Sequence, residues 1–111
     1  MTGALPSIIT DWFASRGWAP RRHQLEMLDA AQRRQNALLV ASTGAGKTLA
    51  GFLPSLIELD AITSEGPRRP HRLHTLYISP LKALTTDVAR NLETPVREMN
   101  LPLRIETRTG D

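Results

Sequence analysis

The 111-residue sequence predicts an α/β fold, with a parallel β-sheet and flanking helices. Short apolar or alternating segments at 37–41, 73–79 and 103–109 are separated by helical patterns, the strand–helix order of parallel sheets with right-handed crossovers. A glycine-rich turn, ASTGAGKT (41–48), stands between the first predicted strand and the next helix. A strand, a turn and a helix in this order are typical of a phosphate-binding site.

The composition is that of one small globular domain, with 41% hydrophobic and 23% charged residues. Twelve of the 14 basic residues are arginine and the net charge is +3, which allows a polyanionic partner or reflects a codon preference for arginine. The absence of cysteine excludes disulfides and thiolate metal sites. With no signal-like or membrane-length apolar run, we expect a soluble cytoplasmic protein.

Two helices are expected before the first strand. The first has Ile8, Ile9, Trp12 and Phe13 on one face, which indicates core positions, and Gly17 is placed to end it. Pro20 opens the second helix, and Asn36 is expected to break it. Its apolar residues are Leu25, Met27, Leu28 and Ala31. The fully apolar run 37–41 then suits a buried parallel strand.

After the turn, an apolar stripe predicts a third helix, which Pro54 should kink or shorten. The stripe consists of Leu49, Phe52, Leu53, Leu56 and Ile57. Residues 64–72 are polar and rich in proline and arginine, as in a surface loop. The second strand, 73–79, leads into a long helical pattern that Pro95 should interrupt. That pattern consists of Leu81, Leu84, Val88, Leu92, Val96 and Met99.

The third strand, 103–109, alternates apolar and polar residues. Three parallel strands without further partners would leave unpaired edges and half-covered faces. We therefore expect the front part of a larger domain rather than a complete one.

The glycine-rich turn has the residues that a triphosphate requires. Gly44 and Gly46 allow the backbone amides to approach phosphate oxygens, and the following helix directs its positive end at them. Lys47 can reach the β- and γ-phosphates, and the Thr48 hydroxyl can ligate Mg²⁺. The strict pattern begins with glycine where this sequence has Ala41. The alternative is a chance glycine-rich turn with an exposed lysine.

The carboxylate that would complete a hydrolytic site, at the end of a neighbouring strand, is missing. Asp60 belongs to the helix that follows the turn, and the second strand ends at Ser79. Glu106 lies inside the third strand and Asp111 is terminal. Hydrolysis by these 111 residues alone is therefore not expected.

Four segments together resemble one family. GWAPRRHQ, ASTGAGKT, SPLKAL and TRTGD resemble the Q-motif and motifs I, Ia and Ib of superfamily 2 helicases, specifically the large helicase-related (Lhr) group of DEXH-box helicases and its ligase-associated type. The resemblance runs from about Trp12 to Asp111. It implies a P-loop NTPase fold, with N-terminal helices and the Q-motif-like segment in 1–36 and an incomplete first RecA-like domain in 37–111.

The resemblance also implies roles for residues. ATP and Mg²⁺ would be held by Thr43, Gly44, Ala45, Gly46, Lys47 and Thr48, with Lys47 as the catalytic residue and Thr48 on the metal. Gln24 would bind the adenine edge, although a capping or solvated glutamine is the alternative. Trp18, Arg21 or Arg22 could stack on the base. Ser79, Lys82, Thr107 and Arg108 would contact the backbone of single-stranded DNA, or of RNA or a DNA–RNA hybrid. A solvated Lys82 is the alternative there.

The function implied is the N-terminal part of an ATP-dependent DNA helicase or translocase, acting in DNA repair and associated with a DNA ligase. Because the DEXH box and the second RecA-like domain are absent, this chain alone should be inactive. Three other functions stay open: a stand-alone ATP-binding module or remnant without motor activity, a small phosphotransferase, and a nucleic-acid-binding fragment whose loop has no ATP role.

Overall fold

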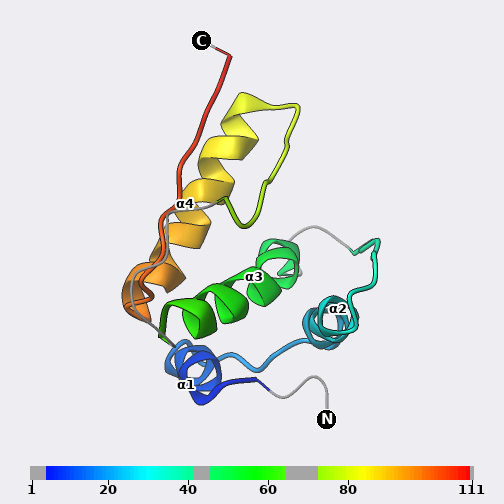
Figure 1. Cartoon of the computed structure of the whole chain (residues 1–111), viewed down its shortest axis with the longest axis vertical. Coiled ribbons are helices and arrows are strands. Elements are labelled where there is room, and N and C mark those ends of the chain that lie inside the picture. The colour runs from blue at the N-terminus through cyan, green and yellow to red at the C-terminus, as the bar shows by residue number, and fades with distance from the viewer. Residues whose placement is uncertain (1–4, 42–45, 65–72, 111) are drawn as a thin grey trace.

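The computed structural model describes residues 5–41, 46–64 and 73–110 of the chain. Within these ranges four helices form: α1 (Ser7–Ser15), α2 (Arg22–Gln32), α3 (Lys47–Ser64) and α4 (Lys82–Glu98). Helix α2 packs along α3, and α3 also contacts α4. Figure 1 shows α1 at one end of the molecule and the first turn of α4 at the other.

The core lies where α1, α3 and the end of α4 meet. Its buried residues are Ile9, Trp12, Phe13, Leu53, Leu56, Leu92, Met99 and Leu101. The predicted placement of Trp12 and Phe13 in the core is confirmed, because both side chains are at least 93% buried. Leu28 on α2 is also fully buried, as its helical spacing predicts.

Helices α1, α2 and α4 end in the same way. At each end a residue with positive φ follows the last turn: Gly17 (71°), Arg34 (58°) and Asn100 (55°). The next amide bonds back into the helix, as Trp18 N–H does to the Phe13 carbonyl at 2.9 Å. The predicted end of α1 at Gly17 is confirmed. The predicted break of α2 at Asn36 was placed too late, because Arg34 takes the left-handed conformation first.

Neither internal proline ends its helix. Helix α3 continues through Pro54 to Ser64, and α4 continues through Pro95 to Glu98. The predicted shortening at Pro54 and interruption at Pro95 were therefore wrong. Each proline removes one backbone donor, but buried side chains on either side hold the helix in place, such as Leu53 and Leu56 around Pro54.

The three predicted strands are not formed within the described residues. Segments 37–41, 73–79 and 103–109 contain no strand pairing there, so the sheet remains a prediction. Most apolar side chains of the first two segments lie in solvent, with Leu38 89% exposed and Ile78 80% exposed. Leu103 and Ile105 of the third segment are instead partly buried against the core. A parallel sheet is stable when neighbouring strands pair its edges and helices cover both faces, which these segments lack here.

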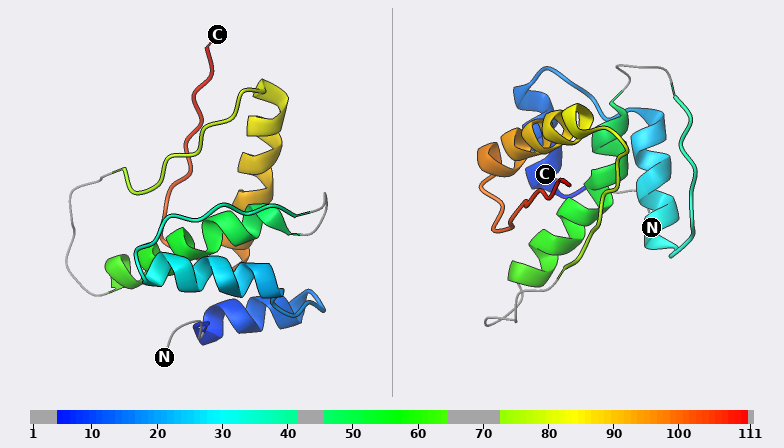
Figure 2. Two further views of the ribbon diagram at one scale, coloured as in Figure 1. Left: turned by 90° about the vertical axis from the view of Figure 1, so that its right-hand side faces the viewer. Right: turned by 90° about the horizontal axis from the view of Figure 1, so that it is seen from above.

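Two of these segments nevertheless lie against helices. Residues 73–79 are attached to α3, where His74 Nε2 is 3.0 Å from Glu58 Oε1 and the Thr75 hydroxyl donates to Ser55 at 2.7 Å. The segment after α4 turns back and runs beside that helix towards its first turn, in both views of Figure 2. No helix of the described ranges is long and apolar enough to cross a membrane.

Candidate nucleotide site and nucleic-acid surface

The first turn of α3 carries the residues predicted to hold a triphosphate. Gly46 precedes the helix with φ 78°, a backbone conformation that residues other than glycine rarely adopt. Its carbonyl accepts the Ala50 amide at 3.0 Å, the first helical hydrogen bond. Lys47 begins α3 and is exposed, and Thr48 follows, half-buried. Thr43, Gly44 and Ala45 lie outside the described residues, so their contacts with phosphate remain a prediction.

Gln24 connects this turn to α2. Gln24 is 5% exposed, and both the oxygen and the nitrogen of its side-chain amide make hydrogen bonds. The oxygen accepts the Arg21 backbone N–H at 2.8 Å, and the nitrogen donates to the Gly46 carbonyl at 3.3 Å. A buried amide with two partners is a fixed group rather than a solvated one. Its bond to the Arg21 N–H is the capping-box bond at the start of α2, so the capping alternative is confirmed for the amide oxygen. Gln24 therefore lies against the glycine-rich turn, although the two residues are 22 positions apart.

The same contact leaves no room for a side chain at Gly46. A Cβ atom there would come within 2.7 Å of the Gln24 amide nitrogen. It would also lie 3.9 Å from the Arg21 side chain. Glycine is thus favoured by its backbone angle, and a side chain here would also force the end of the Gln24 side chain to shift. This pairing was not predicted from the sequence, which contains no signal that joins the two positions.

The three candidates for stacking on a base are placed differently. Arg21 lies beside Gly46, whereas Trp18 packs on α1, with its ring centroid 5.6 Å from that of Trp12. Arg22 points to Glu26, 3.4 Å away on the next turn of α2. Of the three, Arg21 is the one that the structure brings next to the glycine-rich turn.

His23 lies between Arg22 and Gln24 in the first turn of α2. Both of its ring nitrogens are buried and lack a hydrogen-bond partner in the described part of the chain. Buried polar atoms nearly always have a partner, so two unpartnered ring nitrogens in the first turn of α2 are unusual.

The residues predicted to contact nucleic acid gather along α4. Ser79 precedes the helix, and its hydroxyl accepts the Leu81 amide at 3.3 Å. Lys82 is the first residue of α4 and is exposed. The segment after α4 runs back beside the helix (Figure 1). Thr107 on this segment thereby lines a hollow together with Thr86, Ala89 and Arg90 from the first half of α4. The Arg108 guanidinium donates to the Thr107 carbonyl at 2.7 Å.

Two of the acidic residues considered for catalysis, Glu106 and Asp60, lie away from the first turn of α3. Glu106 lies between two arginines, 3.1 Å from Arg104 and 3.5 Å from Arg108. Asp60 is in the second half of α3, away from its first turn.

Comparison with known proteins identifies the family. The family model for the DEAD/DEAH box helicases matches residues 21–111, which is most of the chain. The chain belongs to the DEAD/DEAH box helicase family. The matched range includes Gln24, the turn before α3, and the residues gathered along α4.

Individual relatives place the chain within this family. It is 41% identical to the Lhr helicase/uracil glycosylase of Escherichia coli, over 91% of the chain and 7% of that protein. It is 34% identical to the ATP-dependent helicase Lhr-Core protein 2 of Thermococcus barophilus, over 93% of the chain and 13% of that protein. It is 33% identical to the ATP-dependent helicase Lhr-Core of Methanocaldococcus jannaschii, over 82% of the chain and 11% of that protein.

These matches confirm the resemblance to Lhr helicases. The chain spans roughly a tenth of the length of each of these relatives. No solved structure matches it significantly. Membership of the helicase family implies the P-loop, RecA-like fold, ATP and a divalent metal.

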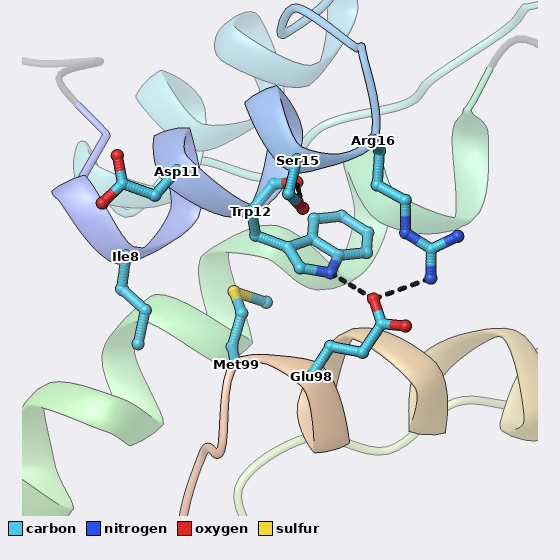
Figure 3. Close-up of a pocket in the computed structure, with 7 residues that line it drawn as sticks. All are labelled: Ile8, Asp11, Trp12, Ser15, Arg16, Glu98 and Met99. Carbon is cyan, nitrogen blue, oxygen red and sulfur yellow. Dashed lines mark hydrogen bonds and ion pairs between the residues drawn. The ribbon is translucent and has the colours of Figure 1, made fainter.

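Helix α1 lies before the part of the chain that the helicase model matches, and it is held by the end of α4. One oxygen of Glu98 accepts hydrogen bonds from the Trp12 indole at 2.8 Å and from Arg16 at 2.7 Å (Figure 3). The Arg16 guanidinium also lies 5.4 Å from the Trp12 ring centroid. The Trp12 hydrogen bond and then the Arg16 hydrogen bond lower the pKa of Glu98, so this carboxylate stays ionised.

Proposed function

We propose that this chain is the nucleotide-binding front of an ATP-dependent helicase or translocase. The observation that supports this most is the contact of Gln24 with Gly46, directly before Lys47 and Thr48. It brings the residue expected to bind the base to the turn expected to bind the phosphates.

The residues present fit a magnesium-bound nucleoside triphosphate. The first amides of α3 and its positive end favour an anion before Lys47, which is exposed and can reach the β- and γ-phosphates. Thr48 would supply a hydroxyl ligand to Mg²⁺. Thr43, Gly44 and Ala45 would complete the loop around the phosphates. The ion would neutralise phosphate charge when it is bound.

Gln24 has further hydrogen-bonding groups beyond its two contacts in the chain, and in this proposal they bind adenine. One amide hydrogen is donated to Gly46, and one oxygen lone pair accepts the Arg21 N–H. The second hydrogen and the second lone pair remain, a donor and an acceptor side by side. Arg21, beside the same turn, is the side chain available to stack on the base.

The second part of the proposal is a nucleic-acid surface along the first half of α4. Ser79, Lys82, Thr107 and Arg108 would contact the backbone of single-stranded DNA, or of RNA or a hybrid. Such contacts give affinity that depends on salt and carries no sequence preference. From the resemblance to Lhr helicases we also propose that the protein acts in DNA repair, associates with a DNA ligase and is cytoplasmic.

The sequence places no carboxylate at the end of a predicted neighbouring strand, so we expect the chain alone to bind ATP without sustained hydrolysis. Magnesium-dependent turnover that is abolished by Lys47→Ala would contradict this expectation.

A binding titration with a fluorescent oligothymidylate tests the function against its main alternative, a stand-alone ATP-binding module. A helicase front should bind the oligonucleotide at low salt and lose affinity in Lys82→Ala. A stand-alone module should bind ATP and be indifferent to the oligonucleotide. Failure of the wild-type chain to bind it at any salt concentration would refute the nucleic-acid part of the proposal.

A further inference from the structure

A hollow of about 340 Å³ lies between α4 and the segment that runs back beside it. It is lined by Thr86, Ala89, Arg90, Glu93, Ile105, Glu106 and Thr107. Of these only Thr107 belongs to the helicase motifs recognised in the sequence. The hollow therefore contains polar groups for which the proposed function gives no role.

Arg90 continues a line that begins at Lys82. Lys82, Thr86 and Arg90 are four residues apart on α4, so they share one face and each step rises about 6 Å along the helix. The Thr86 hydroxyl already donates to the Lys82 carbonyl at 3.3 Å. Along this line the Arg90 guanidinium is thus the next cationic donor after Lys82.

The Arg90 guanidinium is not used by the fold. It is exposed and makes no hydrogen bond or ion pair with the residues that the structure describes. Arg104 and Arg108, in the neighbouring segment, are instead both paired with Glu106. An arginine without a partner beside Thr107 can bind an anion with its two parallel N–H groups.

The acidic residues nearby limit where an anion can lie. Glu106 is balanced by its two arginines, so its charge is largely neutralised. Asp87 is exposed on α4, and Glu93 lines the hollow one turn beyond Arg90. Asp87 is five positions after Lys82 and so lies off the face that Lys82, Thr86 and Arg90 share. An anion is therefore favoured on that face, between Lys82 and Arg90, and disfavoured beyond Glu93.

We propose that Arg90 contacts a backbone phosphate of single-stranded nucleic acid and extends the strand's path from Lys82 down α4. This inference rests on the proposed nucleic-acid function and adds a residue outside the helicase motifs. The path ends at Glu93, whose carboxylate repels the next phosphate.

The test is the salt dependence of oligothymidylate binding by the whole chain. Each phosphate contact with a single strand contributes about 0.7 to the slope of log affinity against log salt. Arg90→Ala should therefore reduce the slope by about 0.7 and weaken binding several-fold at low salt. Arg90→Lys should keep most of the slope, because it keeps the charge. Arg33→Ala removes the same charge at the end of α2 and should leave the slope unchanged.

The outcomes separate the two claims. If the wild-type chain does not bind, both the proposed function and this inference fail. If Lys82→Ala weakens binding but Arg90→Ala keeps the wild-type slope, only the inference is overturned. An equal reduction by Arg33→Ala would show a general charge effect and would also overturn it. Because Arg90 is exposed, circular dichroism should show the wild-type helix content in its variants.

Discussion

Replacing Gly46 with alanine should damage the contact between α2 and the glycine-rich turn. The new methyl group would lie 2.7 Å from the Gln24 amide nitrogen, well inside van der Waals contact. The backbone of the new alanine would also have to keep φ near 78°. The left-handed conformation costs a non-glycine residue about 1–2 kcal/mol. Displacing Gln24 loses a hydrogen bond worth about 0.5–1.5 kcal/mol.

Together these effects predict a loss of about 1.5–3.5 kcal/mol in the free energy of unfolding for Gly46→Ala. Urea denaturation followed by fluorescence of the two tryptophans, Trp12 and Trp18, measures it. Gly51→Ala is the matched control, because Gly51 lies inside α3 with nothing within 4 Å of its would-be Cβ. This control should stabilise the chain by about 0.5–1 kcal/mol through helix propensity.

The double variant Gln24→Ala/Gly46→Ala separates the clash from the backbone strain. Removing the Gln24 side chain relieves the 2.7 Å contact, so the two substitutions should cost less together than the sum of their separate effects. Equal stability of Gly46→Ala and Gly51→Ala would refute this reasoning. Strict additivity of the double variant would show that Gln24 and Gly46 are not coupled.

Three other outcomes are expected. Leu28→Ala should lose about 2–5 kcal/mol of unfolding free energy in the same urea assay, because Leu28 is 1% exposed; a loss below that range would contradict its core position. Gln24→Ala should reduce the preference for ATP over GTP in competition titrations, whereas an unchanged preference would remove Gln24 from base recognition. The lowered pKa of Glu98 means that its stabilising contacts with Trp12 and Arg16 are present above the ordinary carboxyl value of 4.5 and are lost as pH falls through its lower folded value. The wild type should therefore lose more stability than Glu98→Gln on acidification below pH 4.5, as thermal unfolding at a series of pH values would show; identical pH profiles would exclude this role.

The helices were predictable because their apolar residues recur with helical spacing. The buried positions Ile9, Trp12 and Phe13 follow directly from that spacing. Helix ends were predictable at Gly17, where glycine favours positive φ, but not at Arg34 or Asn100, which reach that conformation through the closure of the last turn. The effects of Pro54 and Pro95 were overestimated because packing on both sides of each proline outweighs one lost backbone donor.

The site was predictable residue by residue but not as an arrangement. The motifs identified Gln24, Gly46 and Lys47 separately, and only the fold brings the first two into contact across 22 positions. The contacts of Trp12 and Arg16 with Glu98 span 86 and 82 positions and likewise have no local signal. The strand segments were recognised from their apolar pattern, but pairing depends on neighbouring strands that a local pattern cannot supply.

Calorimetric titration of the chain with ATP in the presence of Mg²⁺ tests the central claim, that the turn before α3 holds a triphosphate through Lys47. The account predicts binding by the wild type and a loss of roughly 10- to 100-fold in affinity for Lys47→Ala, because a hydrogen bond from a charged group is worth about 1.5–3 kcal/mol. Lys47 is exposed, so this variant should keep the fold. Equal affinity of the two proteins, or no binding by the wild type, would contradict the account.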